Sequence, residues 1–274
     1  MKNRYVRIFS RHPSHNVIRH KILVPALTAV RFGSSTELTG RYRVVINSVQ
    51  AIKNSSNKLL MKEKFTEAGV KTADWWTTNQ YGELFLSESL IVENCQSREL
   101  PYPIVAKHIY GSRNRGNTLI NSKEELETWM KGKTLNNYIF ERFYNYSREY
   151  RLHVTEDGCF YTCRKMLKSE TPEEERWFRN DSNSVWVLEN NPSFDKPINW
   201  NEVIEHSVKA LKAVGLDIGA VDLRIQSSKH SNGDTRDYCD FIVLEINSAP
   251  SFGDITAKKY AVELSRLINK KLKI

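Results

Sequence analysis

Two oxygen-bearing side chains stand at the end of an apolar run in the last quarter of this 274-residue chain. The run 241–246 has the length and composition of a strand, yet it contains Glu245 and is followed at once by Asn247. Side chains two apart on a strand share a face, so Glu245 and Asn247 should point together, and Leu244 and Ile246 should point into the opposite layer. A buried carboxylate must be paired or hold a metal. The spacing therefore predicts two neighbouring ligands of the kind that Mg²⁺ accepts while it shares its shell with phosphates.

A third acidic side chain should join this pair. The run 219–225 has the pattern of a strand and carries Asp222. A polar turn that contains Asn232 and Gly233 separates it from the strand of Glu245, which predicts an antiparallel hairpin. The hairpin would bring Asp222 within reach of Glu245 and Asn247, so the sequence predicts three oxygen ligands together.

Two lysines are candidates for holding an anion near these ligands. Lys58 falls in the first turn of a predicted amphipathic helix, 57–69, which Ser55 or Ser56 could cap. A cation is unfavourable at the positive end of a helix dipole, so a phosphate contact would explain its position; a plain surface lysine is the alternative. Lys107 ends a short apolar strand, where a lysine usually faces solvent.

The segment 111–116 has the composition of an anion-binding turn. It lies between two predicted strands and carries Gly111, Ser112, Arg113 and Gly116. The tip of such a hairpin can fold over an anion, with hydroxyl, guanidinium and backbone N–H groups as donors. Glycine and asparagine also occur in ordinary hairpin turns, so the composition leaves both interpretations open.

Two further strands carry charged residues. The strand 138–143 is apolar except for Glu141 and Arg142, and the alternating strand 147–154 places Glu149 and Arg151 on one face. Cross-strand ion pairing and ligand binding are both open for Glu149 and Arg151.

The other elements follow from periodicity and turn residues. Ser122 and Glu125 form a capping box, and Gly215 closes a well-patterned helix. We expect helices at 123–131, 201–214 and 257–271, strands at 70–77, 102–107, 118–120 and 159–167, and a polar loop at 169–191 that presents Trp177, Phe178, Arg179 and Asn180.

The first 50 residues are the least informative part of the chain. They contain two short strand-like pieces and three histidines, His12, His15 and His20, without acidic or cysteine partners at metal-ligand spacing. A solvated basic arm is the better interpretation, and an anion-binding surface is the alternative.

Charge and composition narrow the function classes. A net charge of +9, a pI near 9.3 and 40% hydrophobic residues describe a globular protein with an anionic partner, or one with a merely basic surface. The four cysteines form no CxxC pair, so we expect reduced thiols rather than a zinc site. No run has signal-peptide or membrane-span character, which predicts a soluble, cytoplasmic protein.

Taken in order, these residues resemble the ATP-grasp superfamily, and within it the carboxylate-amine ligases of the ribosomal-protein S6 glutamate ligase (RimK-like) and D-alanine ligase type. The resemblance runs from about residue 54 to residue 256 and is strongest at Asp222 followed by LEINSAP; VAK at Lys107, FERF and EYR come next. It implies an α+β fold of two lobes with mainly antiparallel sheets that grip ATP between them. It implies a short N-terminal region at 1–53, an N-terminal lobe at 54–137 and a C-terminal lobe at 138–274.

The resemblance also implies a role for each matching residue. Lys58 and Lys107 would contact ATP phosphates under a lid formed by residues 111–116. Adenine would be held by Glu141 and the backbone of Arg142 and Phe143, and ribose would lie near Glu149. Asp222, Glu245 and Asn247 would bind Mg²⁺, with two ions expected and Mn²⁺ as an alternative. Arg151, Arg179 and Asn180 would stabilise the transferred phosphate.

The implied activity is ATP-dependent activation of a carboxylate as an acyl phosphate, followed by attack of an amine and release of ADP and phosphate. The carboxylate and amine partners would be small molecules or peptides, with an acidic protein tail among the candidates. A nucleic-acid-binding protein and a phosphotransferase that stops before ligation are the alternatives. The sequence departs from the family pattern in two places. The loop 111–116 has only two glycines, and the N-terminal region is shorter than usual in the family.

Overall fold

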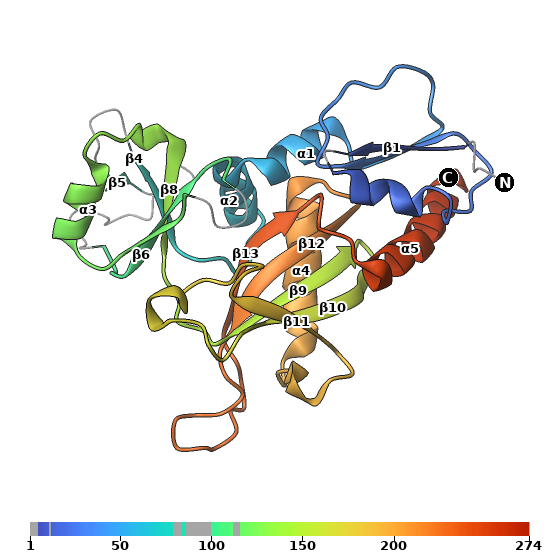
Figure 1. Cartoon of the computed structure of the whole chain (residues 1–274). Helices are drawn as coiled ribbons and strands as arrows, with labels where there is room; N and C mark the ends of the chain where they lie inside the picture. The colour runs from blue at the N-terminus through green and yellow to red at the C-terminus, as the bar shows by residue number, and fades with distance from the viewer. Residues whose placement is uncertain (1–4, 11, 79–83, 86–99, 112–115, 274) are drawn as a thin grey trace.

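The computed structural model describes residues 5–10, 12–78, 84–85, 100–111 and 116–273, which form three sheets with helices packed against them (Figure 1). Two of the sheets are antiparallel and have five strands each, and the third is a small parallel sheet. The predicted α+β class with mainly antiparallel sheets is confirmed.

The central sheet has the strand order β11-β10-β9-β12-β13. Alternation along its strands separates an apolar face from a charged face: Tyr150, Leu152 and Val154 of β9 are buried in the core, whereas Glu149 and Arg151 point to the other side. Helices α1, α2 and α4 cover the apolar face. The elements are α1 (Val49–Ser56), α2 (Lys58–Glu67), β9 (Arg148–Thr155), β10 (Gly158–Leu167), β11 (Ser184–Leu188), α4 (Trp200–Val214), β12 (Ile218–Ile225) and β13 (Phe241–Asn247).

The second five-stranded sheet has the order β5-β4-β8-β6-β7 and forms the lobe that is green in Figure 1. Its own small core, which includes Ala106 and Phe140, is closed by helix α3. The predicted Ser122 cap of α3 is confirmed, since the Ser122 hydroxyl accepts from the Glu125 N–H at 3.2 Å. The box is not reciprocal, because the Glu125 carboxylate accepts from the Asn121 N–H at 2.7 Å rather than from the Ser122 N–H. The elements are β4 (Trp75–Thr78), β5 (Leu84–Phe85), β6 (Ile104–His108), β7 (Thr118–Ile120), α3 (Lys123–Met130) and β8 (Tyr138–Arg142).

The N-terminal residues do not form a solvated arm, so that prediction was wrong. Val6 and Ile18 have no exposed surface and His15 is 1% exposed, because a three-stranded sheet packs against the last helix around a shared apolar cluster. The first strand is short and lies in a basic stretch, which hid it in the sequence. The elements are β1 (Val6–Ser10), a 3₁₀ helix (Pro13–Ile18), β2 (Thr28–Phe32), β3 (Val44–Ile46) and α5 (Asp254–Leu272).

Three local predictions need correction. Asn57, not Ser55 or Ser56, caps α2, because both serines lie inside the preceding helix α1. The segment 70–74 does not belong to β4. Lys71 and Thr72 pair with β13, where the Lys71 carbonyl accepts from the Val243 N–H at 2.8 Å, and the Asp74 carbonyl accepts from the Arg142 N–H of β8 at 2.9 Å. The predicted loop 169–191 contains the edge strand β11.

A β-bulge corrects the fourth prediction, which concerned Leu244. Asp222 lies opposite Glu245, but the next residue of β12 lies opposite Val243, so Leu244 is an extra residue. Ile246 and Val243 lie in the core, whereas Leu244 is only half-buried and does not share their layer. Residue spacing cannot reveal a bulge.

No helix among the described residues is long and apolar enough to cross a membrane. The expected domain boundaries after residues 53 and 137 remain a prediction.

Candidate functional site

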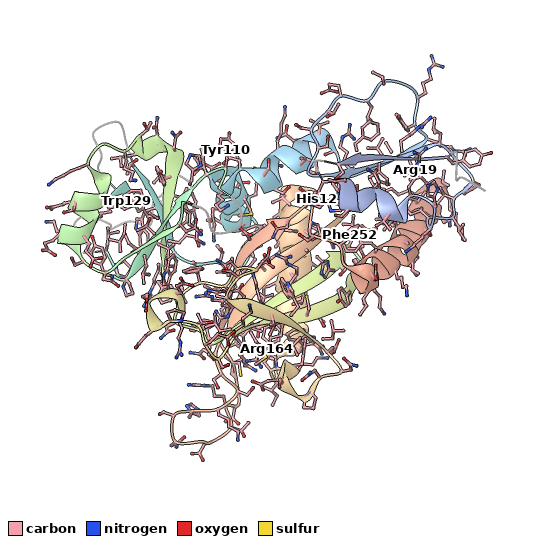
Figure 2. All side chains as sticks on the ribbon, in the orientation of Figure 1. His12, Arg19, Tyr110, Trp129, Arg164 and Phe252 are labelled. Atoms are coloured by element: carbon pink, nitrogen blue, oxygen red, sulfur yellow. The ribbon has the colours of Figure 1, made fainter. Side chains whose placement is uncertain are left out.

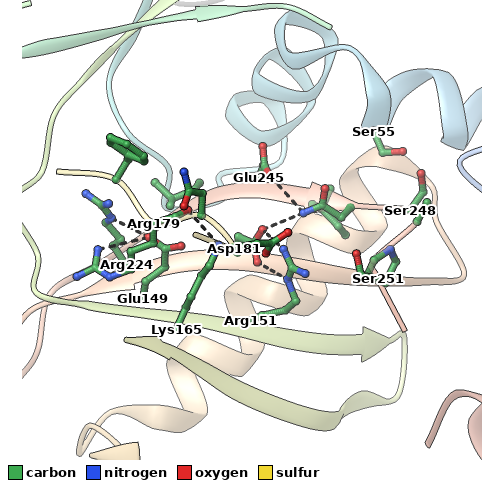
Figure 3. Close-up of a pocket in the computed structure, with 18 of the residues that line it drawn as sticks. Ser55, Glu149, Arg151, Lys165, Arg179, Asp181, Arg224, Glu245, Ser248 and Ser251 are labelled. Carbon is green, nitrogen blue, oxygen red and sulfur yellow. Dashed lines mark hydrogen bonds and ion pairs between the residues drawn. The ribbon is translucent and has the colours of Figure 1, made fainter. Parts of the chain in front are cut away.

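The charged face of the central sheet borders a cavity of about 1240 Å³, which also receives residues from the second sheet and the N-terminal segment (Figure 3). Most of the predicted site residues line it. Ser112 and Arg113 lie outside the described residues, and Gly116 is described but does not line the cavity. The predicted residues that line it are Lys58, Lys107, Gly111, Glu141, Arg142, Phe143, Glu149, Arg151, Arg179, Asn180, Asp222, Glu245 and Asn247.

The three predicted metal ligands lie together on β12 and β13. Asp222 and Glu245 are opposite one another in the hairpin, and the Asn247 side-chain amide donates to Asp222 Oδ2 at 2.9 Å and to Glu245 Oε1 at 3.3 Å. Nowhere in the described part of the chain do three His, Cys, Asp or Glu side chains gather in a metal-ligand arrangement. The predicted set of three therefore depends on the Asn247 amide.

The donor set of this trio fits a hard divalent cation. Burial raises the pKa of Asp222, and the nearby Glu245 and Glu149 carboxylates act in the same direction, although Arg151 opposes them. Burial alone would also raise the pKa of Glu245, but Lys58 and Lys107 outweigh it and lower that pKa. Each of the two carboxylates therefore already lies near a cationic side chain, Asp222 beside Arg151 and Glu245 beside Lys58.

Arg151 makes a bidentate ion pair with Asp222. Its Nε and Nη2 atoms donate to the two Asp222 oxygens at 2.7 and 2.8 Å, and the indole of Trp186 lies 4.9 Å from the guanidinium carbon. Burial opposes the charge on Arg151, but the Asp222 carboxylate outweighs it and raises the pKa of Arg151. The arginine is therefore held beside the predicted metal ligands as a permanent cation.

The two predicted phosphate-binding lysines approach from different elements. Lys58, at the start of α2, donates to the Gly111 carbonyl and lies 3.7 Å from Glu245 Oε2. Lys107, at the end of β6, lies 2.8 Å from Glu141 Oε2. Both ammonium groups therefore border the cavity on the side of the second sheet.

Glu141 has a second partner that sequence reasoning missed. The Lys62 ammonium lies 3.3 Å from the same oxygen, Oε2, and is completely buried. Burial alone would raise the pKa of Glu141, but Lys107 and Lys62 outweigh it and lower that pKa, so the carboxylate is ionised. The available signal was the spacing: Lys62 is one helical turn after Lys58 on the predicted helix.

Glu149 is held by two arginines at the other end of the charged face. Arg224 Nε lies 3.2 Å and Arg179 Nη1 lies 3.5 Å from Glu149 Oε2, and burial lowers the pKa of Arg179 to about 10 (Figure 3). The sequence analysis did not single out Arg224. Strand alternation places it on the same face of β12 as Asp222, which lies two residues before it. The Asn180 side-chain oxygen accepts from the Asn183 N–H at 3.0 Å and so shapes its own loop at the cavity edge.

The N-terminal segment closes the far end of the cavity. His15 donates through Nε2 to the Pro250 carbonyl at 2.8 Å, and its ring packs 4.6 Å from the Phe252 ring. Burial lowers the pKa of His15. Figure 2 shows His12 and Phe252 where this segment meets the chain between β13 and α5. The segment 248–252, which follows the predicted metal ligands, is thus held by residues far away in the sequence.

Comparison with known proteins gives matches among solved structures alone, since no protein-family model and no curated protein matches the sequence. A D-alanine–D-alanine ligase from Bacillus anthracis, complexed with ATP, has a TM-score of 0.60 and 13% identity over 98% of this chain and 97% of its own. An N5-carboxyaminoimidazole synthetase from Staphylococcus aureus, complexed with ADP, has a TM-score of 0.56 and 18% identity, over 86% and 56%.

A third similar structure is described as the ATP-grasp ligase PsnB complexed with a minimal precursor. It has a TM-score of 0.52 and 16% identity, over 84% of this chain and 64% of its own. At sequence identities this low, the structural similarity supports a shared fold and does not establish a shared reaction. The chain therefore has the ATP-grasp fold, which the strand aspartate, the LEINSAP run and the lysine-ended strand predicted.

Proposed function

We propose that this chain is an ATP-dependent ligase that activates a carboxylate as an acyl phosphate and joins it to an amine, releasing ADP and phosphate. The observation that carries the proposal is the meeting of Asp222, Glu245 and Asn247 with Lys58 and Lys107 around one cavity. Adjacent oxygen ligands and lysine ammonium groups are what a metal-bound triphosphate needs.

We assign to the matching residues the roles that the family resemblance implies. Lys58 and Lys107 would contact the phosphates, and the segment from Gly111 to Gly116, including Ser112 and Arg113, would cover them. Glu141, with the Arg142 and Phe143 backbone, would bind adenine, and Glu149 would lie near ribose. Asp222, Glu245 and Asn247 would hold Mg²⁺, which neutralises the β- and γ-phosphate charge when bound.

Phosphoryl transfer in such a site needs positioning and charge rather than a protein nucleophile. A substrate carboxylate oxygen attacks the γ phosphorus, and the bond to the β-phosphate oxygen breaks to release ADP. Arg151, Arg179 and Asn180 would stabilise the transferred group. The amine nitrogen then attacks the acyl carbon, loses a proton, and phosphate leaves. Exclusion of water protects the acyl phosphate between the two steps.

The size of the cavity supports a second substrate beside the nucleotide. Its volume of about 1240 Å³ exceeds the roughly 300–1,000 Å³ of a typical single-ligand pocket. PsnB, one of the similar structures, was solved with a precursor peptide. We propose a small-molecule or peptide carboxylate, with an acidic protein tail included, because the protein carries a net charge of +9.

A thermal-shift experiment tests nucleotide binding. Saturating Mg-ATP should raise the melting temperature by about 5 °C, and Glu245→Gln should abolish the gain because it removes one metal-ligand charge. Glu263→Gln is the matched control: it neutralises a carboxylate that is paired with Arg266 outside the cavity, and it should keep the gain. A wild-type protein with no response to Mg-ATP would contradict the proposal.

The reaction itself is tested by screening carboxylates and amines for ADP release and weighing the products. A ligated product supports the ligase. A phosphorylated product without an amide bond would instead establish a phosphotransferase.

A further inference from the structure

One buried carboxylate in the candidate site faces two buried or half-buried ammonium groups. Glu141 Oε2 is 2.8 Å from Lys107 Nζ and 3.3 Å from Lys62 Nζ. The side chain of Lys107 is 15% exposed and borders the cavity, whereas that of Lys62 is 0% exposed. One lysine would be enough to balance the charge of Glu141, so the presence of Lys62 beside Lys107 needs an explanation.

Lys62 is held in place independently of Glu141. Its ammonium donates at 2.6 Å to the Thr72 hydroxyl, which in turn donates at 2.7 Å to the Val243 carbonyl on β13. The chain of contacts therefore starts at Glu141 on β8, passes through α2, and ends two residues before Glu245. Lys62 cannot turn toward the cavity without breaking it.

The charges suggest different roles for the two lysines. A Lys107 ammonium that contacts a phosphate divides its three N–H donors and its charge between that phosphate and Glu141. If Lys107 were the only partner, this sharing would leave the buried carboxylate with a weakened counter-charge, which is unfavourable. With Lys62 present, the carboxylate remains paired.

We propose that Lys62 is a positioning residue that keeps Glu141 compensated when Lys107 engages the nucleotide. This inference rests on the proposed function, because it requires Lys107 to contact ATP. Lys62 touches no substrate in this arrangement. It acts by lowering the free-energy cost of freeing Lys107.

The test is a double-mutant cycle on Mg-ATP affinity, measured by calorimetry with wild type, Lys62→Met, Glu141→Gln and the double variant. Lys62→Met should weaken Mg-ATP binding by roughly 100-fold, while the nucleotide-free protein keeps its fold because Lys107 still pairs with Glu141. In the Glu141→Gln background the same substitution should change affinity by less than about threefold, because no carboxylate is left to compensate.

Lys64→Met is the matched control, since Lys64 lies on the same helix and pairs with Glu67 at the surface; it should leave Mg-ATP affinity unchanged. If Lys62→Met does not fold, Lys62→Gln replaces it, because its amide is polar and uncharged and so removes the charge without placing a wholly apolar side chain beside Thr72. Equal losses in both backgrounds would overturn the inference, as would wild-type affinity in Lys62→Met. A wild type that does not bind Mg-ATP would instead refute the proposed function.

Discussion

At the scale of single residues, burial determines which side chains carry charge. His153 shows this on the charged face of the central sheet: it is 2% exposed, its Nδ1 lies 2.9 Å from the Tyr260 hydroxyl, and Arg151 precedes it by two residues on the same face. Burial, together with the Arg151 charge, lowers the pKa of His153 from its ordinary value of 6.5 to about 3. The imidazole is therefore neutral in the folded protein.

This gives a pH prediction with a defined sign. Below pH 6.5 the unfolded chain protonates His153 and the folded chain does not, so stability falls as pH is lowered from about 6.5 toward about 3. When the pH is lowered from 7 to 5, the neutral His153 should reduce the free energy of unfolding by about 2 kcal/mol. Urea unfolding of His153→Gln should show a correspondingly weaker pH dependence.

His20→Gln is the control for that measurement, because His20 is exposed at the surface. It should retain the full pH dependence of the wild type. An unaltered pH dependence in His153→Gln would contradict the assignment of a neutral, buried imidazole.

At the scale of elements, helix ends and a bulge position the site. Asn57 stops α1 and starts α2, and its side-chain oxygen accepts from the N–H groups of Leu59 and Leu60 at 2.9 and 3.2 Å. The next residue, Lys58, is thereby fixed at the cavity. On β13 the bulge at Leu244 keeps Glu245 opposite Asp222.

Loss of the Asn57 cap should therefore affect stability and the site together. Asn57→Ala should lower the unfolding free energy by about 1 kcal/mol, and, if Lys58 contacts phosphate, it should also weaken Mg-ATP binding. Ser48→Ala is the comparison, since Ser48 caps α1 through the Ala51 N–H at 3.0 Å. It should lose similar stability without loss of affinity. Equal urea midpoints for Asn57→Ala and wild type would rule out the capping role.

At the scale of the whole molecule, the N-terminal sheet and α5 form one apolar cluster, against which Ala249 and Phe252 of the segment after β13 also pack. Gly33 lies at this contact: its φ is +65°, and a Cβ atom there would be 2.9 Å from the Ala249 Cβ. A side chain at this position would push the segment that borders the cavity.

Gly33→Ala should accordingly destabilise the protein beyond the backbone cost. Gly132→Ala separates the two effects, because Gly132 has a φ of +73° and a Cβ atom added there would meet no heavy atom within 4 Å. Both variants should lose about 1 kcal/mol for the left-handed backbone, and only Gly33→Ala should lose more. Identical unfolding free energies would show that the contact with Ala249 adapts without cost.

The sequence by itself determined the elements with strong local signals. Helix 201–214 with its glycine end, the Ser122 cap, the hairpin of Asp222 and Glu245, and the shared face of Glu245 and Asn247 all follow from periodicity, capping and turn residues, and the structure has each of them. The helix ends and the shared strand face depend on neighbours within a few residues. The hairpin depends on the pairing of two strands that follow one another in the sequence. The motif at 244–250 also predicted the fold.

Tertiary structure alone decided the rest, because the deciding contacts join distant parts of the chain. The N-terminal strand pairs with β2 and joins the apolar cluster that it shares with α5, residues 71–72 pair with β13, and the bulge moves Leu244 out of the core. The same holds for the charges around the site. Lys62 and Arg224 matter because folding buries them beside Glu141 and Glu149, where an ionic partner replaces lost hydration, and no spacing in the sequence specifies that partner.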